Sequence, residues 1–197
     1  MAIRLESGPA LTPRAVKAAA RRGAERKEGF FQAAARGDHD AVADFVRTAW
    51  PSAHRVAYLV LGDRHAAEDV AQESVLKALS ALKRFDSSRR LEPWIGRIAA
   101  NCAIDYARKL REVPVGDRFD ESFAQVFDPG DSTLDPSIRN AMRQLSVEDR
   151  AAVVMRHVLE FSPEEIGSVL GWTGGATRSR IHRAMSSIRN GLEDYHD

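Results

Sequence analysis

The chain has 197 residues, 44% of them hydrophobic, and a formal net charge of +1. This length accommodates one or two small domains with real hydrophobic cores. We find neither an apolar run of eighteen residues nor a secretory signal, so we expect a cytoplasmic protein without membrane insertion. A single cysteine, Cys102, excludes an internal disulfide and is expected to be a buried thiol. The six histidines stand at no metal-ligand spacing, so neither a metal nor a cofactor is expected.

The small net charge hides a strong segregation of charge along the chain. Residues 1–37 carry eight basic and three acidic residues, whereas residues 112–136 carry one basic and seven acidic residues. Because electrostatic fields act locally, these segments should meet different partners. We interpret residues 1–28 as a basic N-terminal arm that becomes helical on a partner. A disordered tail without function is an equal alternative.

Apolar residues recur at helical spacing after residue 29 and predict a series of helices. The pattern breaks around Gly37 and Asp38, which indicates a helix boundary there. Pro51 should end or kink the next helix, because proline lacks the backbone N–H that a helix interior needs. The apolar pattern then continues and stops at Gly62.

The next helix is expected over residues 66–82 and has two contrasting sides. Its apolar positions are Val70, Val75, Leu76, Leu79 and Leu82. Its other side carries Glu68, Asp69, Gln72 and Glu73. An exposed face of acids and an amide is suited to a basic partner.

A polar, basic loop is predicted over residues 85–92, followed by a helix that opens at Pro93 and runs to about Arg111. The buried face of this helix is Ile95, Ile98, Ala99, Cys102 and Tyr106. The opposite face is Arg97, Asn101, Arg108 and Arg111. With Trp94 at the junction, this pattern suits single-stranded nucleic acid, because arginines pair with phosphates while an aromatic ring or pocket holds bases. An ordinary core Trp94 beside a solvated charged face is an equally good interpretation.

Proline, glycine and acidic residues interrupt the helical pattern over residues 112–136. We interpret this segment as a flexible acidic linker between two helical domains, residues 29–111 and 137–197. Helices resume after the linker, and the S-x-x-D run at residues 146–149 marks a helix start.

The C-terminal domain carries the pattern of a helix-turn-helix. Ser162, Pro163 and Glu165 form a capping box for a short helix, which should end at Gly171 in a left-handed conformation. Thr173 is placed to cap a second helix. From Thr173 to residue 190 there are four arginines and no acid. Such a basic second helix enters the DNA major groove in helix-turn-helix proteins, although a solvated charged face is the plainer interpretation.

Taken together, the motifs resemble those of bacterial extracytoplasmic-function sigma factors of the sigma-70 family. The run A-E-D-V-A-Q-E at residues 67–73 is close to the family motif A-E-D-V-x-Q-E. The run W-I-G-R-I-A-A-N at residues 94–101 is similar to W-L-x-x-I-A-x-N. In the second half, T-R-S-R-I-H-R-A at residues 177–184 resembles V-R-S-R-x-x-R-A. Two such regions in this order, separated by a linker, are far more specific than a lone helix-turn-helix.

This resemblance implies an all-α fold of two small domains and a set of binding residues. The first domain would be region 2, and the second would be region 4. Core RNA polymerase, through its beta-prime clamp helices and its beta subunit, would be the main partner. The polymerase-binding residues would be Asp69, Gln72 and Glu73. The residues for the minus-ten element, opened as a non-template single strand, would be Arg89, Arg90, Trp94, Arg97, Asn101 and Arg108. The residues for the duplex minus-thirty-five element would be Thr177, Arg178, Ser179, Arg180, His182 and Arg183. An anti-sigma factor is a further expected partner.

Other classes of protein explain less of the sequence. A helix-turn-helix regulator that acts without being a polymerase subunit would account for the second half alone. An enzyme is not expected, because we find no phosphate loop, catalytic triad or metal cluster. A pure adaptor would not need Arg178 and Arg183 on one helix face.

Overall fold

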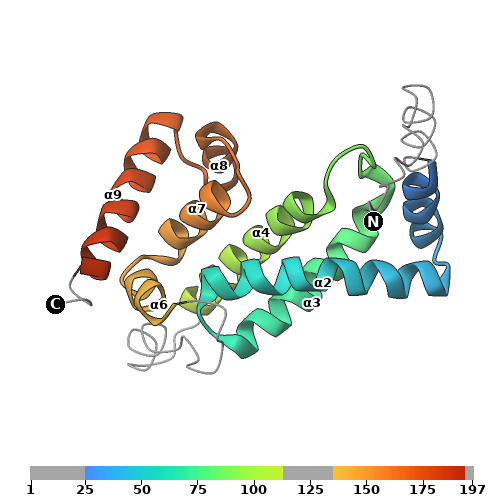
Figure 1. Cartoon of the computed structure of the whole chain (residues 1–197), viewed down its shortest axis with the longest axis horizontal. Helices are drawn as coiled ribbons and strands as arrows, with labels where there is room; N and C mark the ends of the chain where they lie inside the picture. The colour runs from blue at the N-terminus through green and yellow to red at the C-terminus, as the bar shows by residue number, and fades with distance from the viewer. Residues whose placement is uncertain (1–24, 113–134, 194–197) are drawn as a thin grey trace, which may run out of the picture.

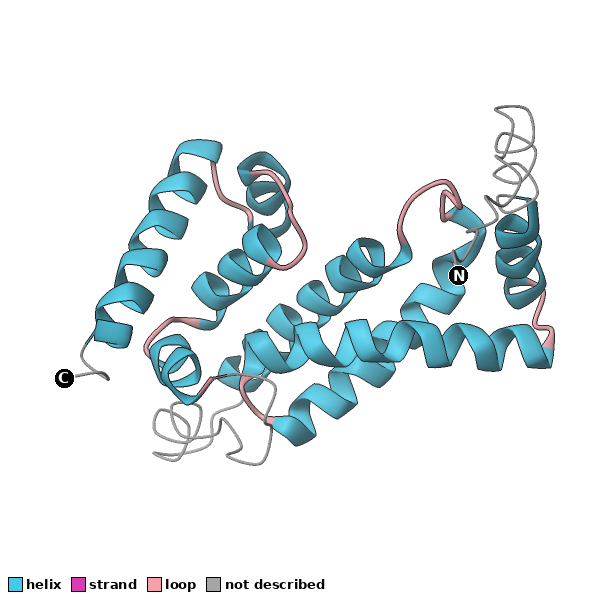
Figure 2. Cartoon of the chain, viewed as in Figure 1, coloured by secondary structure: helices cyan, strands magenta, loops and turns pink. Residues whose placement is uncertain are grey.

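The computed structural model describes residues 25–112 and 135–193, and this part of the chain is built from helices without any strand (Figures 1 and 2). Residues 1–24 of the predicted arm (1–28) and residues 113–134 of the predicted linker (112–136) lie outside the described residues. Residues 25–35 are helical. The elements that follow are α2 (His39–Leu61), α3 (Arg64–Ala81), the 3-10 turn η1 (Leu82–Arg84), α4 (Leu91–Glu112), α6 (Pro136–Arg143), α7 (Val147–His157), α8 (Pro163–Leu170) and α9 (Gly174–Glu193).

In the N-terminal half, α2, α3 and α4 pack against one another. Phe45, Leu61 and Ile95 are among the largest fully buried side chains of this core. Cys102 is buried, as expected for a structural thiol. No helix in the described part is both long and apolar enough to cross a bilayer.

Local capping residues set the ends of these helices. Asp38 caps α2 by accepting a hydrogen bond from the amide of Ala41, and Asp63 caps α3 by accepting one from Ala66. Gly62 ends α2 in a left-handed conformation with φ 76°, which glycine adopts at little cost. The predicted breaks at Asp38 and Gly62 are therefore confirmed.

Two predicted helix boundaries differ from the structure, and both involve proline. Of the two alternatives for Pro51, the helix end is wrong, because α2 runs through it from His39 to Leu61. Ala49 and Ala53 are fully buried on either side, so packing holds the helix together despite the lost hydrogen bond. In α4, helical structure begins at Leu91, before Pro93, because a proline is tolerated in the first turn, where its missing N–H would be unpaired.

In the C-terminal half, α9 packs against α6, α7 and α8. The predicted capping box is present: the amide of Ser162 donates to Glu165 over 2.8 Å, and the amide of Glu165 donates to the Ser162 hydroxyl over 3.2 Å. Gly171 ends α8 with φ 73°. Thr173 accepts from the amide of Ala176 and so caps α9, as predicted.

The two halves are in direct contact. Helix α7 packs on both α2 and α4 (Figure 1). Buried residues of both halves belong to one continuous hydrophobic cluster. The surface of α4 therefore has two packing neighbours, its own bundle and the C-terminal helices.

Candidate polymerase and nucleic-acid interfaces

An exposed acidic face lies on α3. Asp69, Gln72 and Glu73 are exposed and stand at helical spacing on one side of the helix. Glu73 accepts a hydrogen bond from Lys77, with 2.7 Å between the charged groups, and this bond holds the pKa of Glu73 below its ordinary value. Leu76, assigned from the sequence to the apolar stripe, is instead 58% exposed next to this face. An exposed leucine beside acids extends the face with an apolar contact surface.

The loop between η1 and α4 is held by the helical segment 25–35. Lys27 donates a hydrogen bond from Nζ to the carbonyl oxygen of Arg89 over 2.8 Å. The Phe31 ring meets Phe85 edge-on, with 4.9 Å between centroids, and Phe85 meets Trp94 at 4.7 Å. Sequence reasoning missed this support, because Lys27 fell within the predicted arm and the two phenylalanines are 54 positions apart.

The loop itself carries exposed charges, and Trp94 follows it in the first turn of α4. Arg89 and Arg90 are both exposed. Arg89 lies 3.4 Å from Asp86, and Arg90 lies 3.8 Å from Glu92. Hydrogen bonds from Ser88 to Asp86 tighten the loop and lower the pKa of that carboxyl. Trp94 is half-buried and packs against the core. Its ring thus serves packing in this structure, while the two arginines remain at the surface.

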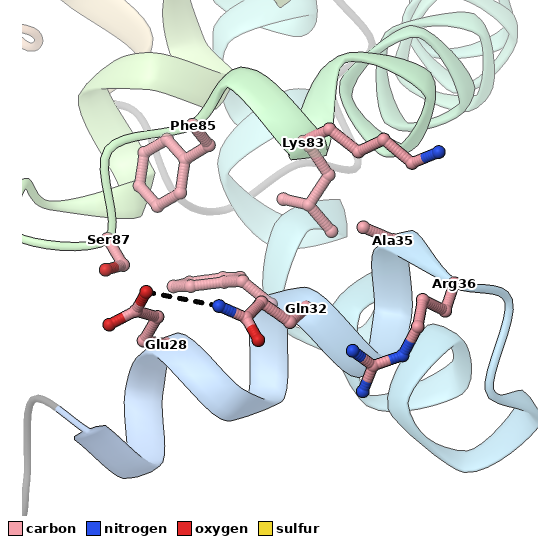
Figure 3. A pocket seen from close by; sticks show the side chains of 9 residues that line it. Glu28, Gln32, Ala35, Arg36, Lys83, Phe85 and Ser87 are labelled. Atoms are coloured by element: carbon pink, nitrogen blue, oxygen red, sulfur yellow. Dashed lines mark hydrogen bonds between the residues drawn. The ribbon is translucent and has the colours of Figure 1, made fainter.

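A groove of about 290 Å³ opens beside the loop, between the segment 25–35 and η1 (Figure 3). Phe31 and Phe85 supply apolar walls, while Gln32 and Ser87 supply polar groups. Gln32 is itself fixed by a hydrogen bond to Glu28. The groove combines an apolar surface with hydrogen-bonding groups.

On α4, the polar residues predicted for DNA share a single cleft. Arg97, Asn101 and Arg108 line a cleft of about 280 Å³ whose opposite wall is Ser168 and Val169 of α8. Arg97 and Asn101 are half-buried and Arg108 is exposed. The structure therefore brings these three side chains together, but on a surface that α8 faces.

On α9, four of the six predicted residues present exposed side chains. These are Arg178, Ser179, His182 and Arg183. Arg178 forms an ion pair with Glu164 of α8 over 2.8 Å. This exposed set forms one polar, basic surface.

The other two residues predicted on α9, Thr177 and Arg180, make contacts within the protein. Thr177 is 0% exposed, and its hydroxyl donates to the carbonyl oxygen of Thr173, so it has no surface to offer a ligand. Thr177 lies on the same side of α9 as Ile181, Ala184 and Ile188, and all four side chains are buried. Arg180 is half-buried: it donates to Asp149 over 2.9 Å and lies 4.0 Å from the ring centre of Trp172.

Close approach of α8 to the turn positions α9. A Cβ on Gly167 would lie 2.7 Å from the carbonyl oxygen of Trp172 and 2.9 Å from the hydroxyl of Thr177. Only glycine allows this approach without a shift of the backbone. A glycine in mid-helix was the signal available in the sequence, but it became meaningful only with the fold. In the described residues, no group of acidic, histidine or cysteine side chains could hold a metal ion.

Comparisons with known proteins agree with this architecture. The family model of Sigma-70 region 2 matches residues 45–113, and that of Sigma-70, region 4 matches residues 136–188. These two regions in one helical chain define a transcription initiation protein of the sigma-70 class. The chain belongs to the family of ECF RNA polymerase sigma factors, which direct promoter recognition and transcription initiation.

Individual relatives support this assignment. The chain is 32% identical over 173 residues to the ECF RNA polymerase sigma factor SigW of Bacillus subtilis (strain 168), covering 81% of this chain and 92% of SigW. It is 34% identical over 158 residues to the RNA polymerase sigma factor CarQ of Myxococcus xanthus, covering 78% of this chain and 90% of CarQ. Among solved structures, the sigma factor RpoE of Bartonella quintana, in complex with the anti-sigma factor NepR, shares the fold with a TM-score of 0.57 at 22% identity, over 77% of this chain and 96% of RpoE.

Proposed function

We propose that this sigma factor assigns polymerase binding, minus-ten recognition and minus-thirty-five recognition to three separate surfaces. The observation that carries the proposal is the placement of the predicted residues on α3, on the loop with α4, and on α9, with polar side chains at the surface of each. The α3 surface takes the beta-prime clamp helices through Asp69, Gln72 and Glu73. The beta subunit is a second contact within core polymerase.

The minus-ten element binds as an opened non-template strand along the loop and α4. Arg89, Arg90, Arg97 and Arg108 pair with phosphates, and Asn101 donates to and accepts from a base edge. The groove lined by Phe31 and Phe85 lies beside this path and has the apolar surface that an unstacked base requires. Unstacking a base costs a few kcal/mol, which pocket and phosphate contacts offset.

The minus-thirty-five element binds as duplex in front of α9. Arg178, Ser179, His182 and Arg183 face outward and supply donors for base edges and phosphates. Arg180 acts through the fold, since it is held by Asp149 and Trp172. Glu164 competes with DNA for Arg178 and must release it when the duplex binds.

An anti-sigma factor is a further proposed partner. RpoE is similar in fold and was solved with the anti-sigma factor NepR. CnrH, with a TM-score of 0.51 at 23% identity and covering 84% of this chain and 96% of CnrH, was solved with the cytosolic domain of CnrY. Both likenesses support an inhibitor that engages the helical surfaces of this chain.

Promoter opening tests the assignment of α4. Asn101→Ala should leave core binding intact but reduce open-complex formation, because the opened strand loses a base contact. The defect should shrink on a template whose minus-ten region is already mismatched, since the cost of opening is then removed. Permanganate footprinting of reconstituted holoenzyme on both templates measures this, using a promoter recovered by transcription of a random library.

A matched substitution separates function from folding. Asn140→Ala removes an exposed amide on α6, outside the cleft lined by Arg97, Asn101 and Arg108, and should open the promoter normally. Normal opening by Asn101→Ala would exclude its proposed role. A lower melting temperature together with equal defects on both templates would make Asn101 a packing residue.

A further inference from the structure

The loop between η1 and α4, residues 85–90, is fixed from outside as well as from within. Within the loop, the amide of Arg89 donates to the carbonyl oxygen of Asp86 over 3.0 Å, and the amide of Ser88 donates to the Asp86 side chain. From outside, the Nζ of Lys27 donates to the carbonyl oxygen of Arg89 over 2.8 Å. Both backbone polar groups of Arg89 are therefore held, one by the loop itself and one by a residue 62 positions earlier in the chain.

The helical segment 25–35 also packs against both ends of this loop. Phe31 is 6% exposed, and its ring meets the ring of Phe85, the residue that follows η1. Phe85 in turn contacts the ring of Trp94 in the first turn of α4, with 4.7 Å between the ring centres. Figure 3 shows the segment lying across from Phe85 and Ser87. The segment thus reaches the start of the loop, its middle and, through Phe85, the helix that follows it.

The side chains that this support leaves exposed are the two loop arginines. The side chains of Arg89 and Arg90 are 80% and 77% exposed. Their ion pairs with Asp86 and Glu92 lie in solvent, where such pairs contribute little. Both guanidinium groups can therefore exchange a carboxylate for a phosphate at small cost, while the backbone that carries Arg89 stays fixed.

The hydrogen bond from Lys27 should matter more for position than for stability. It lies at the surface, where water can satisfy the carbonyl oxygen of Arg89 almost equally well, so its net contribution to stability is small. The segment that carries Lys27 is anchored on the core by the buried side chains of Phe31 and Ala34. The main consequence of the bond is therefore the place that Arg89 occupies.

We propose that segment 25–35 is the support that holds the loop 85–90 in place for the opened non-template strand, with Lys27 as its positioning residue. The proposal rests on the phosphate contacts proposed for Arg89 and Arg90. A loop that is fixed before it meets DNA loses less conformational freedom on binding than a loop that must be ordered at that moment. Lys27 acts through the loop and makes no contact with DNA itself.

Amide hydrogen exchange in the free full-length chain tests the support without DNA. Lys27→Met keeps a long side chain and removes the donor, so the amides of residues 86–90 should exchange about two- to tenfold faster than in the wild type. Lys27→Arg retains a donor and should exchange like the wild type. Arg26→Met removes the neighbouring exposed charge and should also exchange like the wild type. Unchanged exchange in Lys27→Met overturns the proposal.

Binding to a single strand tests what the support does for function. Reconstituted holoenzyme is titrated, by fluorescence anisotropy, into an oligonucleotide that carries the non-template minus-ten sequence of a promoter recovered by transcription of a random library. Lys27→Met should bind this strand about two- to tenfold more weakly, whereas Lys27→Arg and Arg26→Met should bind normally. The affinity of Lys27→Met should also depend less steeply on salt, because misplaced arginines release fewer counterions.

A double-mutant cycle separates positioning from direct contact. In a chain that carries Arg89→Ala and Arg90→Ala, Lys27→Met should weaken strand binding no further, because no loop arginine is left to position. A further loss of the same size in this background would mean that Lys27 itself contacts DNA, and would overturn the proposal. So would a lower melting temperature of Lys27→Met with faster exchange throughout segment 25–35 and α2, since Lys27 would then support the fold as a whole.

The experiments also distinguish a failure of this proposal from a failure of the function proposed for the loop. If Arg89→Ala with Arg90→Ala binds the strand normally, the phosphate contacts are wrong and the proposal falls with them. The exchange data would then still report whether Lys27 holds the loop. If the arginine variant binds weakly but Lys27→Met binds normally, the loop binds DNA without needing the support, and only the present proposal is overturned.

Discussion

At the level of single residues, Arg180 shows how packing can occupy a side chain of a helix that we propose binds DNA. Its guanidinium is clamped between Asp149 and the Trp172 ring, whereas Arg183 on the same helix is exposed. Burial alone would raise the pKa of Asp149, but hydrogen bonds from Arg180 and Ser146 outweigh it and lower the pKa. The two arginines have the same chemistry and different neighbours, so they should have different roles.

Replacing each of these arginines should separate stability from DNA binding. Arg180→Ala should lower the free energy of unfolding. Because the folded-state pKa of Asp149 is lowered, its contribution is complete above the unfolded-state pKa and is lost as the pH falls through the folded-state pKa. The difference in the free energy of unfolding between Arg180→Ala and the wild type should therefore shrink below about pH 4. The loss that remains there is the one due to the contact with Trp172. Urea titrations between pH 3 and 7 measure it.

Arg183→Ala provides the matched comparison. It should leave the unfolding curve unchanged and weaken holoenzyme binding to the minus-thirty-five element by about 1–3 kcal/mol, if the side chain contacts a base edge. Equal losses of stability in both variants would contradict the distinction.

At the level of elements, two glycines of the helix-turn-helix look alike in the sequence and differ in the structure. Gly167 lies under the Trp172 carbonyl, whereas a Cβ on Gly175, in the first turn of α9, would have no atom within 4 Å. Local geometry thus requires glycine at the first position only.

Alanine at these two positions should shift stability in opposite directions. Gly167→Ala should destabilise the protein by about 1–3 kcal/mol, because the methyl group forces the turn away from α8. Gly175→Ala should stabilise it by about 0.5–1 kcal/mol, because alanine favours helix and restricts the unfolded chain. Thermal unfolding followed by circular dichroism measures both; destabilisation by Gly175→Ala would contradict the open surroundings of that residue.

The α3 face can be tested as a unit. Asp69→Arg combined with Gln72→Ala should weaken binding to core polymerase without unfolding the chain, because both side chains are exposed and point away from the core. A fluorescence titration with core polymerase gives the affinity, and circular dichroism reports on folding. Asp44→Arg on α2 reverses another exposed acid and should bind normally. Unchanged affinity of the α3 variant would exclude this face from the interface.

At the level of the whole molecule, the contact of α7 with α2 and α4 should couple the unfolding of the two halves. Their buried residues form one continuous cluster, so neither half can lose its structure without exposing apolar surface of the other. The contact between the two halves should therefore have a thermodynamic signature.

Calorimetry should reveal this coupling directly. Leu159 lies against Gly96 of α4. The wild-type protein should unfold in one transition, whereas Leu159→Asp, which places a charge at this contact, should give two. The transition of the N-terminal half should then change little, because its own core is intact. Two transitions in the wild-type protein would show that the halves unfold independently.

The sequence alone was sufficient to predict most helices and their capping residues, because both depend on residues that are close together in the chain. Ser162 with Glu165, Gly171, Thr173 and Asp38 all act within one turn of the chain, and the structure confirms each of them. The all-α fold and the family follow from motifs of the same local kind. Pro51 was misjudged because packing from other helices outweighs its local preference.

Contacts between distant segments were decided only by the tertiary structure. Periodicity placed Arg97 and Asn101 on a polar face, but it could not show that Leu159, Phe161 and α8 face them from more than 50 residues away. The burial of Arg180 and the need for Gly167 likewise depend on which surfaces meet. A sequence pattern reports the environment that a side chain prefers, whereas the folded chain determines which neighbour provides it.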